Sequence, residues 1–322
     1  MDNVLSPIKY SFVVPIYNDG ILAPEFCKEF DRVFSTWLNI KSISNQVELI
    51  FVNDGSPDNS TEILKLLNKD FPFVKVIELS RNFGQHIALT CGYHHSKGEF
   101  VGMLNVDMED PPSEIPNLLS FMIDGDFDIV YGLRAERESP FLDKLTSKLF
   151  QILLNKLTGN NFPLNTSTLR VMNRKFVDAY KSFSEKNRYL PGLEMWLGFK
   201  KGFTKTKHQA RQSGASSYNF RRRLSMAFEA IVSFSDLPLR WSVLFGFILA
   251  TIGFLLNIVL VIKRLFWTQM QPGYTSTVSI VVLFSGIQII LLGMLGIYVG
   301  RILKESQGRP LYVIRSKYNF IE

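Results

Sequence analysis

The segment 100–112, FVGMLNVDMEDPP, places oxygen-bearing side chains at alternate positions directly after an apolar run. These side chains are Asn105, Asp107 and Glu109, and alternate residues of an extended chain face the same side. Mg²⁺ and Mn²⁺ prefer such oxygen ligands and commonly bridge to the phosphates of a substrate. The pattern therefore predicts a divalent cation at the end of a strand, and a solvent-exposed acidic turn is the alternative.

The elements that would position these residues alternate along the first 210 residues. Apolar runs predict strands at 10–17, 47–54, 73–80, 100–107 and 127–133. Helical patterns lie between the early strands, near 22–38, 60–70 and 85–96. Continuous apolar strands joined by helices indicate an α/β domain with a mostly parallel sheet covered on both faces. In such a sheet the site lies off the carboxyl ends of the strands.

Polar side chains follow these predicted strands, as a site at their carboxyl ends requires. Tyr17 and Asp19 follow the first strand, Asp54 ends the second, Arg81 follows the third and Arg134 follows the fifth. The chain contains neither a Walker loop nor a G-x-G-x-x-G run, so the common phosphate-cradling motifs are absent from the sequence. The convergence of these groups on one sheet edge predicts a nucleotide site with a hard metal ion.

The net charge of the chain is compatible with several classes of partner and does not choose among them. The formal net charge of +7 suits a phosphate-bearing substrate, an anionic membrane surface or nucleic acid. Two cysteines in apolar helical patterns suggest small core residues in a reducing compartment rather than a disulfide.

Two long uncharged runs follow residue 236. Residues 241–262 and 275–300 contain no Asp, Glu, Lys or Arg, and each is long enough to cross a hydrocarbon core of about 30 Å. Two such runs joined by a short loop predict a transmembrane hairpin, and a buried core helix is the alternative. Basic residues lie beyond the outer ends of both runs, whereas the loop holds only Lys263 and Arg264. The positive-inside rule therefore places both chain ends in the cytoplasm.

These features divide the chain into four parts. We expect a catalytic domain over 1–210, a linker with an amphipathic interfacial helix over 211–238, a hairpin over 239–303 with spans at about 241–262 and 277–300, and a cytoplasmic tail over 304–322. The interfacial helix is inferred from apolar residues at helical spacing beside Arg221–Arg223, and an ordinary helix of the soluble domain is the alternative.

Several motifs in combination resemble one enzyme family. They read SFVVPIYND, LIFVNDGSPDNS, LSRNFGQHIAL, NVDMEDPPSEIP, DIVYGLR and LLGMLGIYVGRILKESQGRPLYVI. Together they resemble the family-two, GT-A-fold polyprenyl-phosphate glycosyltransferases, which include dolichol-phosphate mannose synthase and the bacterial undecaprenyl-phosphate glucosyl- and aminoarabinosyl-transferases. The resemblance covers nearly the whole chain, including both predicted spans.

The resemblance implies a membrane-bound, metal-dependent glycosyltransferase with a Rossmann-like GT-A domain. Such an enzyme transfers a sugar, with inversion, from a nucleotide-diphosphate sugar to undecaprenyl or dolichyl phosphate, for modification of lipopolysaccharide or another surface glycan. It implies Mg²⁺ or Mn²⁺ as cofactor and a multi-pass protein of the inner (plasma) membrane, with its catalytic domain in the cytoplasm. It further implies a homo-oligomer, by resemblance a tetramer, and no nucleic-acid partner.

The resemblance also implies roles for individual residues. The nucleoside is expected to contact Pro15, Tyr17, Asp19 and Asp54, and the strand-end pattern adds Arg81 and Asn105 to this nucleotide-sugar-binding set. The metal ligands are expected to be Asp107 and Glu109, and the acceptor phosphate is expected to meet Arg134, Ser147 and Lys148. The catalytic set is Asp107, Arg134 and Arg170.

The chain departs from the family pattern in three places. Where relatives read D-A-D-x-Q-D-P-P, this chain loses an acid at Asn105 and gains one at Glu109, which we interpret as a compensated metal site. Thr168 stands where many relatives carry an Asp proposed as a base, but a phosphate monoester has a second pKa of about 6 and needs little deprotonation. Residues 211–218, RQSGASSY, replace a G-E-S-K-Y run on the acceptor side.

Three other functions remain as alternatives. A family-two transferase with a saccharide acceptor is one, although the chain has no Q-x-x-R-W-type motif. A non-catalytic nucleotide-binding membrane protein is the second, suggested by Asn105 and Thr168. A transporter is disfavoured because the two spans contain no charged residue.

Overall fold

The computed structural model of the chain describes residues 8–134, 165–186, 188, 190–207 and 273–320, with short pieces between 241 and 262. The chain divides into two compact units, which are described separately. The first contains residues 1–155, 160–219 and 310–322, and the second contains 156–159 and 220–309.

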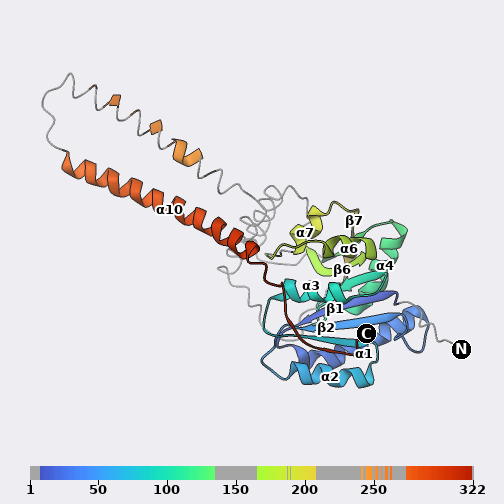
Figure 1. The fold of residues 1–322 in the computed structure, drawn as a ribbon. Coiled ribbons are helices and arrows are strands. Elements are labelled where there is room, and N and C mark those ends of the chain that lie inside the picture. Colours follow the sequence, from blue (N-terminus) through green and yellow to red (C-terminus); the bar gives the residue numbers. More distant parts are fainter. Residues whose placement is uncertain are drawn as a thin grey trace. The chain divides into compact units, whose positions relative to one another are not determined.

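An eight-stranded sheet in the order β7-β5-β6-β4-β1-β2-β3-β8 forms the centre of the first unit (Figure 1). Its strands are β1 (Tyr10–Ile16), β2 (Val47–Asn53), β3 (Val74–Leu79), β4 (Phe100–Met103), β5 (Ile129–Arg134), β6 (Thr166–Asn173), β7 (Lys201–Thr206) and β8 (Ile314–Tyr318). The pairs β1–β2, β1–β4, β2–β3 and β5–β7 are parallel, whereas β6 and β8 run antiparallel to their neighbours. The predicted mostly parallel α/β sheet is confirmed.

Helices follow the early strands at the positions that periodicity predicts. The helices of this unit are α1 (Ala23–Leu38), α2 (Ser60–Asp70), α3 (Gln85–His95), α4 (Ile115–Asp124), α6 (Arg174–Lys181) and α7 (Leu190–Trp196), with short 3-10 turns η1 (Gly20–Leu22) and η2 (Pro112–Glu114). The first three match the predicted ranges within one residue at each end.

The core lies on both faces of the sheet. Phe12 on β1 contacts the rings of Phe30 and Phe34 on α1. The next residue, Val13, points to the opposite face, where a Cβ on Gly92 of α3 would come within 2.2 Å of it. Because α1 and α3 pack on opposite sides of one strand, β1 is buried on both faces, which explains its continuous apolar sequence.

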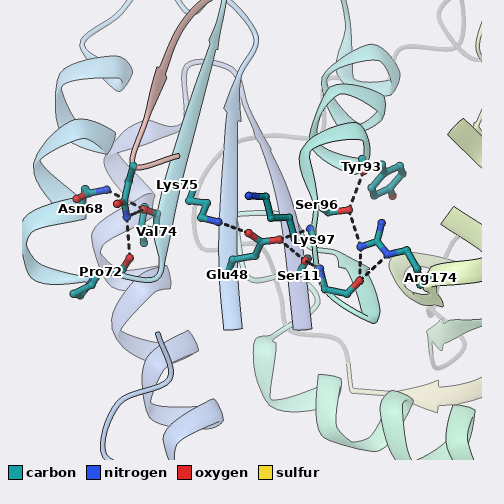
Figure 2. Close-up of polar contacts among 12 residues, drawn as sticks. Ser11, Glu48, Asn68, Pro72, Val74, Lys75, Tyr93, Ser96, Lys97 and Arg174 are labelled. Atoms are coloured by element: carbon teal, nitrogen blue, oxygen red, sulfur yellow. Dashed lines mark hydrogen bonds and ion pairs between the residues drawn. The ribbon is translucent and has the colours of Figure 1, made fainter. Parts of the chain in front are cut away.

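A buried carboxylate joins several segments near the amino ends of the strands (Figure 2). Glu48 on β2 accepts hydrogen bonds from the Ser11 hydroxyl at 2.5 Å and the Lys97 backbone N–H at 2.6 Å, and it pairs with Lys75 Nζ at 2.5 Å. Ser11 in turn accepts the Gly98 N–H at 2.7 Å. Glu48 therefore connects β1, β2, β3 and the turn before β4, at the end of the sheet away from the predicted site.

The last part of the chain adds a strand to the sheet, which the sequence did not indicate. Residues 304–322 were expected to form a tail, but β8 pairs antiparallel with β3 through contacts such as Val76 with Tyr318. A strand of five residues is too short to show a clear alternation of apolar and polar residues. Its pairing with β3, far away in the sequence, leaves no local signal.

The second unit contains a long apolar helix, α10 (Tyr274–Ser306). Its portion Phe284–Ser306, with a mean hydropathy of 1.8 in its most apolar window, is long and apolar enough to cross a membrane. It is the one such helix among the described residues, and it covers most of the second predicted span. The described pieces of the first predicted span are helical, at 241, 244–248, 251–252, 255, 258–259 and 262, and the rest of that span lies outside the described residues. The predicted interfacial helix in 211–238 lies outside them altogether.

Candidate active site

The strand order reverses between β1 and β4, because β2 and β3 lie on one side of β1 and β4 lies on the other. Ligands of open α/β sheets bind beyond the carboxyl ends of the strands at such a point. The two loops that leave these strands carry Tyr17 and Asp19 after β1, and Asn105, Asp107 and Glu109 after β4. Tyr17 is 45% exposed, Asp19 is exposed and Pro15 is half-buried.

A hydrogen-bond chain joins the loops after β1 and β2. The Asn53 carboxamide oxygen accepts the backbone N–H and the hydroxyl of Ser56 at 3.0 and 2.6 Å, and its amide donates to Thr61 at 2.7 Å. The Ser56 hydroxyl accepts the Asn18 N–H at 3.1 Å. Asn18 has a left-handed backbone with φ of 62°. These bonds hold the turn that exposes Tyr17.

Asp54 holds the loop after β3. Its two carboxylate oxygens accept the backbone N–H groups of Phe83 at 2.7 Å and Gly84 at 2.8 Å. Burial raises the pKa of Asp54, while these two hydrogen bonds and the charge of Arg81 oppose the rise. Gly55 has φ of 65°, and a Cβ there would lie 2.4 Å from the Arg81 carbonyl carbon, so the two loops pack closely. The structure gives Asp54 a loop-holding role, and its contact with a nucleoside stays a prediction.

The carboxylates after β4 lie on a turn and not on a strand. The sequence reasoning extended the strand to residue 107, but β4 ends at Met103, and Met108 takes a left-handed conformation with φ of 53°. The expectation that spacing alone aligns the three side chains is therefore wrong. The turn is closed by Asp107 Oδ1, which accepts the Glu109 N–H at 3.2 Å.

Two carboxylates on one turn suit a hard cation, whose other ligands are commonly water and substrate phosphate. Asp107 and Glu109 are both half-buried. Among the residues that the structure describes, no group of three or more His, Cys, Asp or Glu side chains could hold a metal ion. The assignment of these ligands stays a prediction.

The two residues that replace family acids contact each other. The Asn105 amide donates to the Thr168 hydroxyl at 3.0 Å, and Thr168 donates to Asp110 Oδ2 at 3.2 Å. Gln85 at the start of α3 also donates to Asn105, at 3.4 Å. The two departures at 105 and 168 therefore lie at one place in the structure, where the side chains contact each other directly.

Asp110 is a site residue that the sequence reasoning missed. It is 2% exposed, and its Oδ2 accepts hydrogen bonds from the Ser167 hydroxyl and from Arg134 Nη2, the latter at 3.0 Å. Burial alone would raise the pKa of Asp110, but Ser167 and Arg134 outweigh it and hold the pKa below its usual value. The same Arg134 nitrogen lies 3.5 Å from Glu109 Oε2. Asp110 thus places Arg134 beside the carboxylate turn, and the prolines that follow it were its only sequence signal.

Arg170 lies within the domain rather than at its surface. Its Nη1 donates to both carboxylate oxygens of Glu194 on α7, at 2.6 and 2.5 Å, and the two side chains are 7% and 0% exposed. The Tyr131 hydroxyl also donates to Glu194, at 2.9 Å. Burial alone would lower the pKa of Arg170, but the charge of Glu194 outweighs it and the pKa is raised. Arg170 is therefore charged and paired, and its catalytic role stays a prediction.

The structure brings some of the predicted site residues together. Arg134 lies beside Glu109, Arg81 is exposed on the loop that Asp54 holds, and Asn105 lies next to Thr168. Ser147 and Lys148, predicted to meet the acceptor phosphate, lie outside the described residues.

Three known proteins are similar to this chain along nearly its whole length. A bactoprenol glucosyl transferase of Shigella phage SfV is 33% identical over 96% of this chain and 99% of its own length. An undecaprenyl-phosphate 4-deoxy-4-formamido-L-arabinose transferase of Proteus mirabilis is 30% identical over 95% of this chain and 93% of its own. An uncharacterized glycosyltransferase of Bacillus subtilis, YkcC, is 34% identical over 97% of this chain and 94% of its own.

A solved mannosyltransferase from Pyrobaculum calidifontis, in complex with GDP-Man and Mn²⁺, shares 14% identity with this chain, with a TM-score of 0.47 over 96% of this chain and 90% of its own. Residues 11–181 match the family described as Glycosyl transferase family 2. With this match and relatives above 30% identity along nearly its whole length, the chain belongs to glycosyl transferase family 2 and is a glycosyltransferase.

Proposed function

We propose that the protein transfers a sugar from a nucleotide-diphosphate sugar to a polyprenyl phosphate, with inversion at the anomeric carbon. The observation that carries the proposal is the full-length similarity to transferases named for bactoprenol and undecaprenyl phosphate. That similarity includes the apolar α10 region, which a transferase with a soluble acceptor would not need. A role in building or modifying surface glycans would follow from a lipid-linked sugar product.

The site chemistry supports phosphate substrates. Asp107 and Glu109 would hold Mg²⁺ or Mn²⁺, and a divalent cation bound there would neutralise charge on the donor's diphosphate. Arg134 lies beside Glu109 and presents a guanidinium fork, which matches phosphate oxygens. Asp110 holds that guanidinium at 3.0 Å, so its direction is set before substrate binds.

The acceptor needs little help to become a nucleophile. A phosphate monoester with a second pKa of about 6 is largely a dianion at neutral pH. Thr168, which stands where relatives carry an acid, is engaged with Asn105 and Asp110. Catalysis then depends on alignment of the phosphate oxygen with the anomeric carbon and on stabilisation of the departing diphosphate.

We further propose that the protein is a multi-pass protein of the inner (plasma) membrane with its catalytic domain and both ends in the cytoplasm. The support is the apolar span in α10 together with the first uncharged run, residues 241–262, and the basic residues outside both runs. A homo-oligomer, tetrameric by family resemblance, is part of the same proposal.

A reconstitution experiment tests the function. Purified full-length protein is incubated with undecaprenyl phosphate, a panel of nucleotide sugars, and Mg²⁺ or Mn²⁺, and the lipid extract is examined by mass spectrometry for a phosphate-linked monosaccharide. Transfer from one donor, lost on chelation, is expected. Metal-dependent nucleotide binding without product from any donor would favour the non-catalytic alternative, and sugar on a saccharide but not on the lipid would favour the other acceptor.

A further inference from the structure

The segment after α10 contacts the strand that leads into the predicted donor site. β8 pairs with β3 from Val76 to Leu79, with a shift of register between Glu78 and Leu79. β3 continues directly into residues 80–84, here called the donor loop, whose last two backbone N–H groups are held by Asp54. Anything that fixes the end of β3 therefore fixes the start of this loop.

Both backbone groups of Ser80, the first residue of the donor loop, are held by this segment. The Ser80 N–H donates to the Val313 carbonyl at 2.9 Å, and the Ser80 carbonyl accepts Arg315 Nη2 at 3.0 Å. The other terminal nitrogen of Arg315 donates to Glu78 Oε1 at 3.0 Å. One guanidinium fork thus reaches two points on the chain, two residues apart, where β3 ends.

The same segment also reaches the far end of the helix that follows the donor loop. The Tyr312 hydroxyl lies 2.9 Å from His94 Nδ1, near the last turn of α3. α3 begins at Gln85, directly after the donor loop. The donor loop and α3 are therefore held at both ends, at Ser80 and at His94. The residues that hold them are Tyr312, Val313 and Arg315, which follow soon after Ser306, where α10 ends.

We propose that residues 312–318 position the donor loop, with Arg315 as its main positioning residue, so that the chain returning from α10 sets the affinity for the nucleotide sugar. This inference rests on the proposed function. Arg315 is not a catalytic residue, because its contacts are to Glu78 and Ser80 and not to any group that would meet substrate. It acts through the backbone that carries Arg81.

Arg315→Met and Arg315→Lys in the full-length protein test the proposal. Methionine keeps the length of the side chain but removes both hydrogen bonds, whereas lysine keeps the charge and can satisfy one of them. We expect Arg315→Met to raise the KM for the donor by about twofold to tenfold, the scale of one or two hydrogen bonds, and Arg315→Lys to have a smaller effect. The KM for the acceptor and kcat should stay within about twofold of wild type, less than the loss of one hydrogen bond, because the contacts of Arg315 are to Glu78 and Ser80.

Two further variants serve as controls. Lys317→Met changes a cation on the same strand that makes no contact with Ser80 in the described structure, and it should leave the donor KM unchanged. Glu78→Gln removes the ion pair but leaves the hydrogen bond from Arg315 to Ser80. It should therefore raise the donor KM less than Arg315→Met does.

Hydrogen exchange separates this inference from the proposed function. Peptides that cover residues 80–90 should exchange faster in Arg315→Met than in wild type, whether or not the correct donor has been found. Unchanged exchange in that region would overturn the inference, and so would faster exchange with an unchanged donor KM. Lack of transfer by the wild-type protein from every donor would instead overturn the proposed function.

Discussion

The buried pair of Arg170 and Glu194 offers a sharp test of which residues act in the chemistry and which support it. Substitution Glu194→Gln would leave the Arg170 charge in a site where the two side chains are 7% and 0% exposed. Removal of one partner of such a pair costs about 3–5 kcal/mol, a large share of the about 5–15 kcal/mol that stabilises a typical domain. For a domain of this size we expect the melting temperature to fall by about 6–20 °C.

A triple variant separates stability from activity. Arg170→Met, Glu194→Leu and Tyr131→Phe together replace the ion pair and the hydroxyl that donates to Glu194 by apolar groups of similar size. Such replacements are often neutral or stabilising, so the melting temperature should return to near the wild-type value. If Arg170 only supports the sheet, sugar transfer should return with it.

The assay is thermal unfolding of the full-length protein in detergent, followed by the transfer reaction at a temperature where each variant is folded. An unchanged melting temperature for Glu194→Gln would refute the reasoning from burial. A triple variant that is stable but has lost transfer by about a hundredfold or more, the scale of a lost transition-state contact, would show that Arg170 acts in the chemistry as the sequence resemblance implies.

Four other outcomes are expected. Asp107→Asn should abolish transfer and weaken Mn²⁺ binding in a metal titration, with circular dichroism unchanged, and near-normal turnover would show that the ligand is elsewhere. Thr168→Asp should reduce transfer rather than restore a missing base, because the new carboxylate would lie against Asp110, which now accepts the threonine hydroxyl at 3.2 Å; higher activity would contradict this. Glu48→Gln should lower the melting temperature without changing the KM for the donor, since Glu48 lies at the other end of the sheet. Burial, and then the charge of Arg170, lower the pKa of His86 to about 4, so the folded form stays neutral while an unfolded histidine, with a pKa of about 6.5, takes up a proton. Stability should therefore fall as the pH drops from about 6.5 to 4, and His86→Gln should reduce this fall without removing it, because burial also lowers the pKa of His94 to about 4.

The sequence alone was enough for the strands and helices between residues 10 and 95, whereas α4 (Ile115–Asp124) was not predicted. Strands that are buried on both faces are continuously apolar, and β1 and β2 match the predicted ranges to within one residue. Helices that cover a sheet repeat their apolar residues every three or four positions, which is why α1 and α2 were predicted closely. The family assignment that the sequence motifs suggested is confirmed, while the site at the carboxyl edge of the sheet stays a prediction.

The sequence did not predict the turn that follows β4. The apolar run that starts at Phe100 continues through Leu104 and Val106, so it predicted a longer strand than the four residues of β4. Leu104 and Val106 are buried, but they are buried from a turn rather than from a strand. Periodicity reports burial and cannot distinguish these two cases over so few residues.

Residue types, their spacing and their local periodicity determined the strands, the helices and the set of polar groups at one sheet edge, because each of these depends on neighbours within a few positions. The tertiary structure decided which distant residues meet: Asp110 with Arg134 and Ser167, Arg170 with Glu194, Asn105 with Thr168, and β8 with β3. Such contacts depend on strand order and on packing between segments far apart in the chain. These contacts fix how the polar side chains at the sheet edge are oriented.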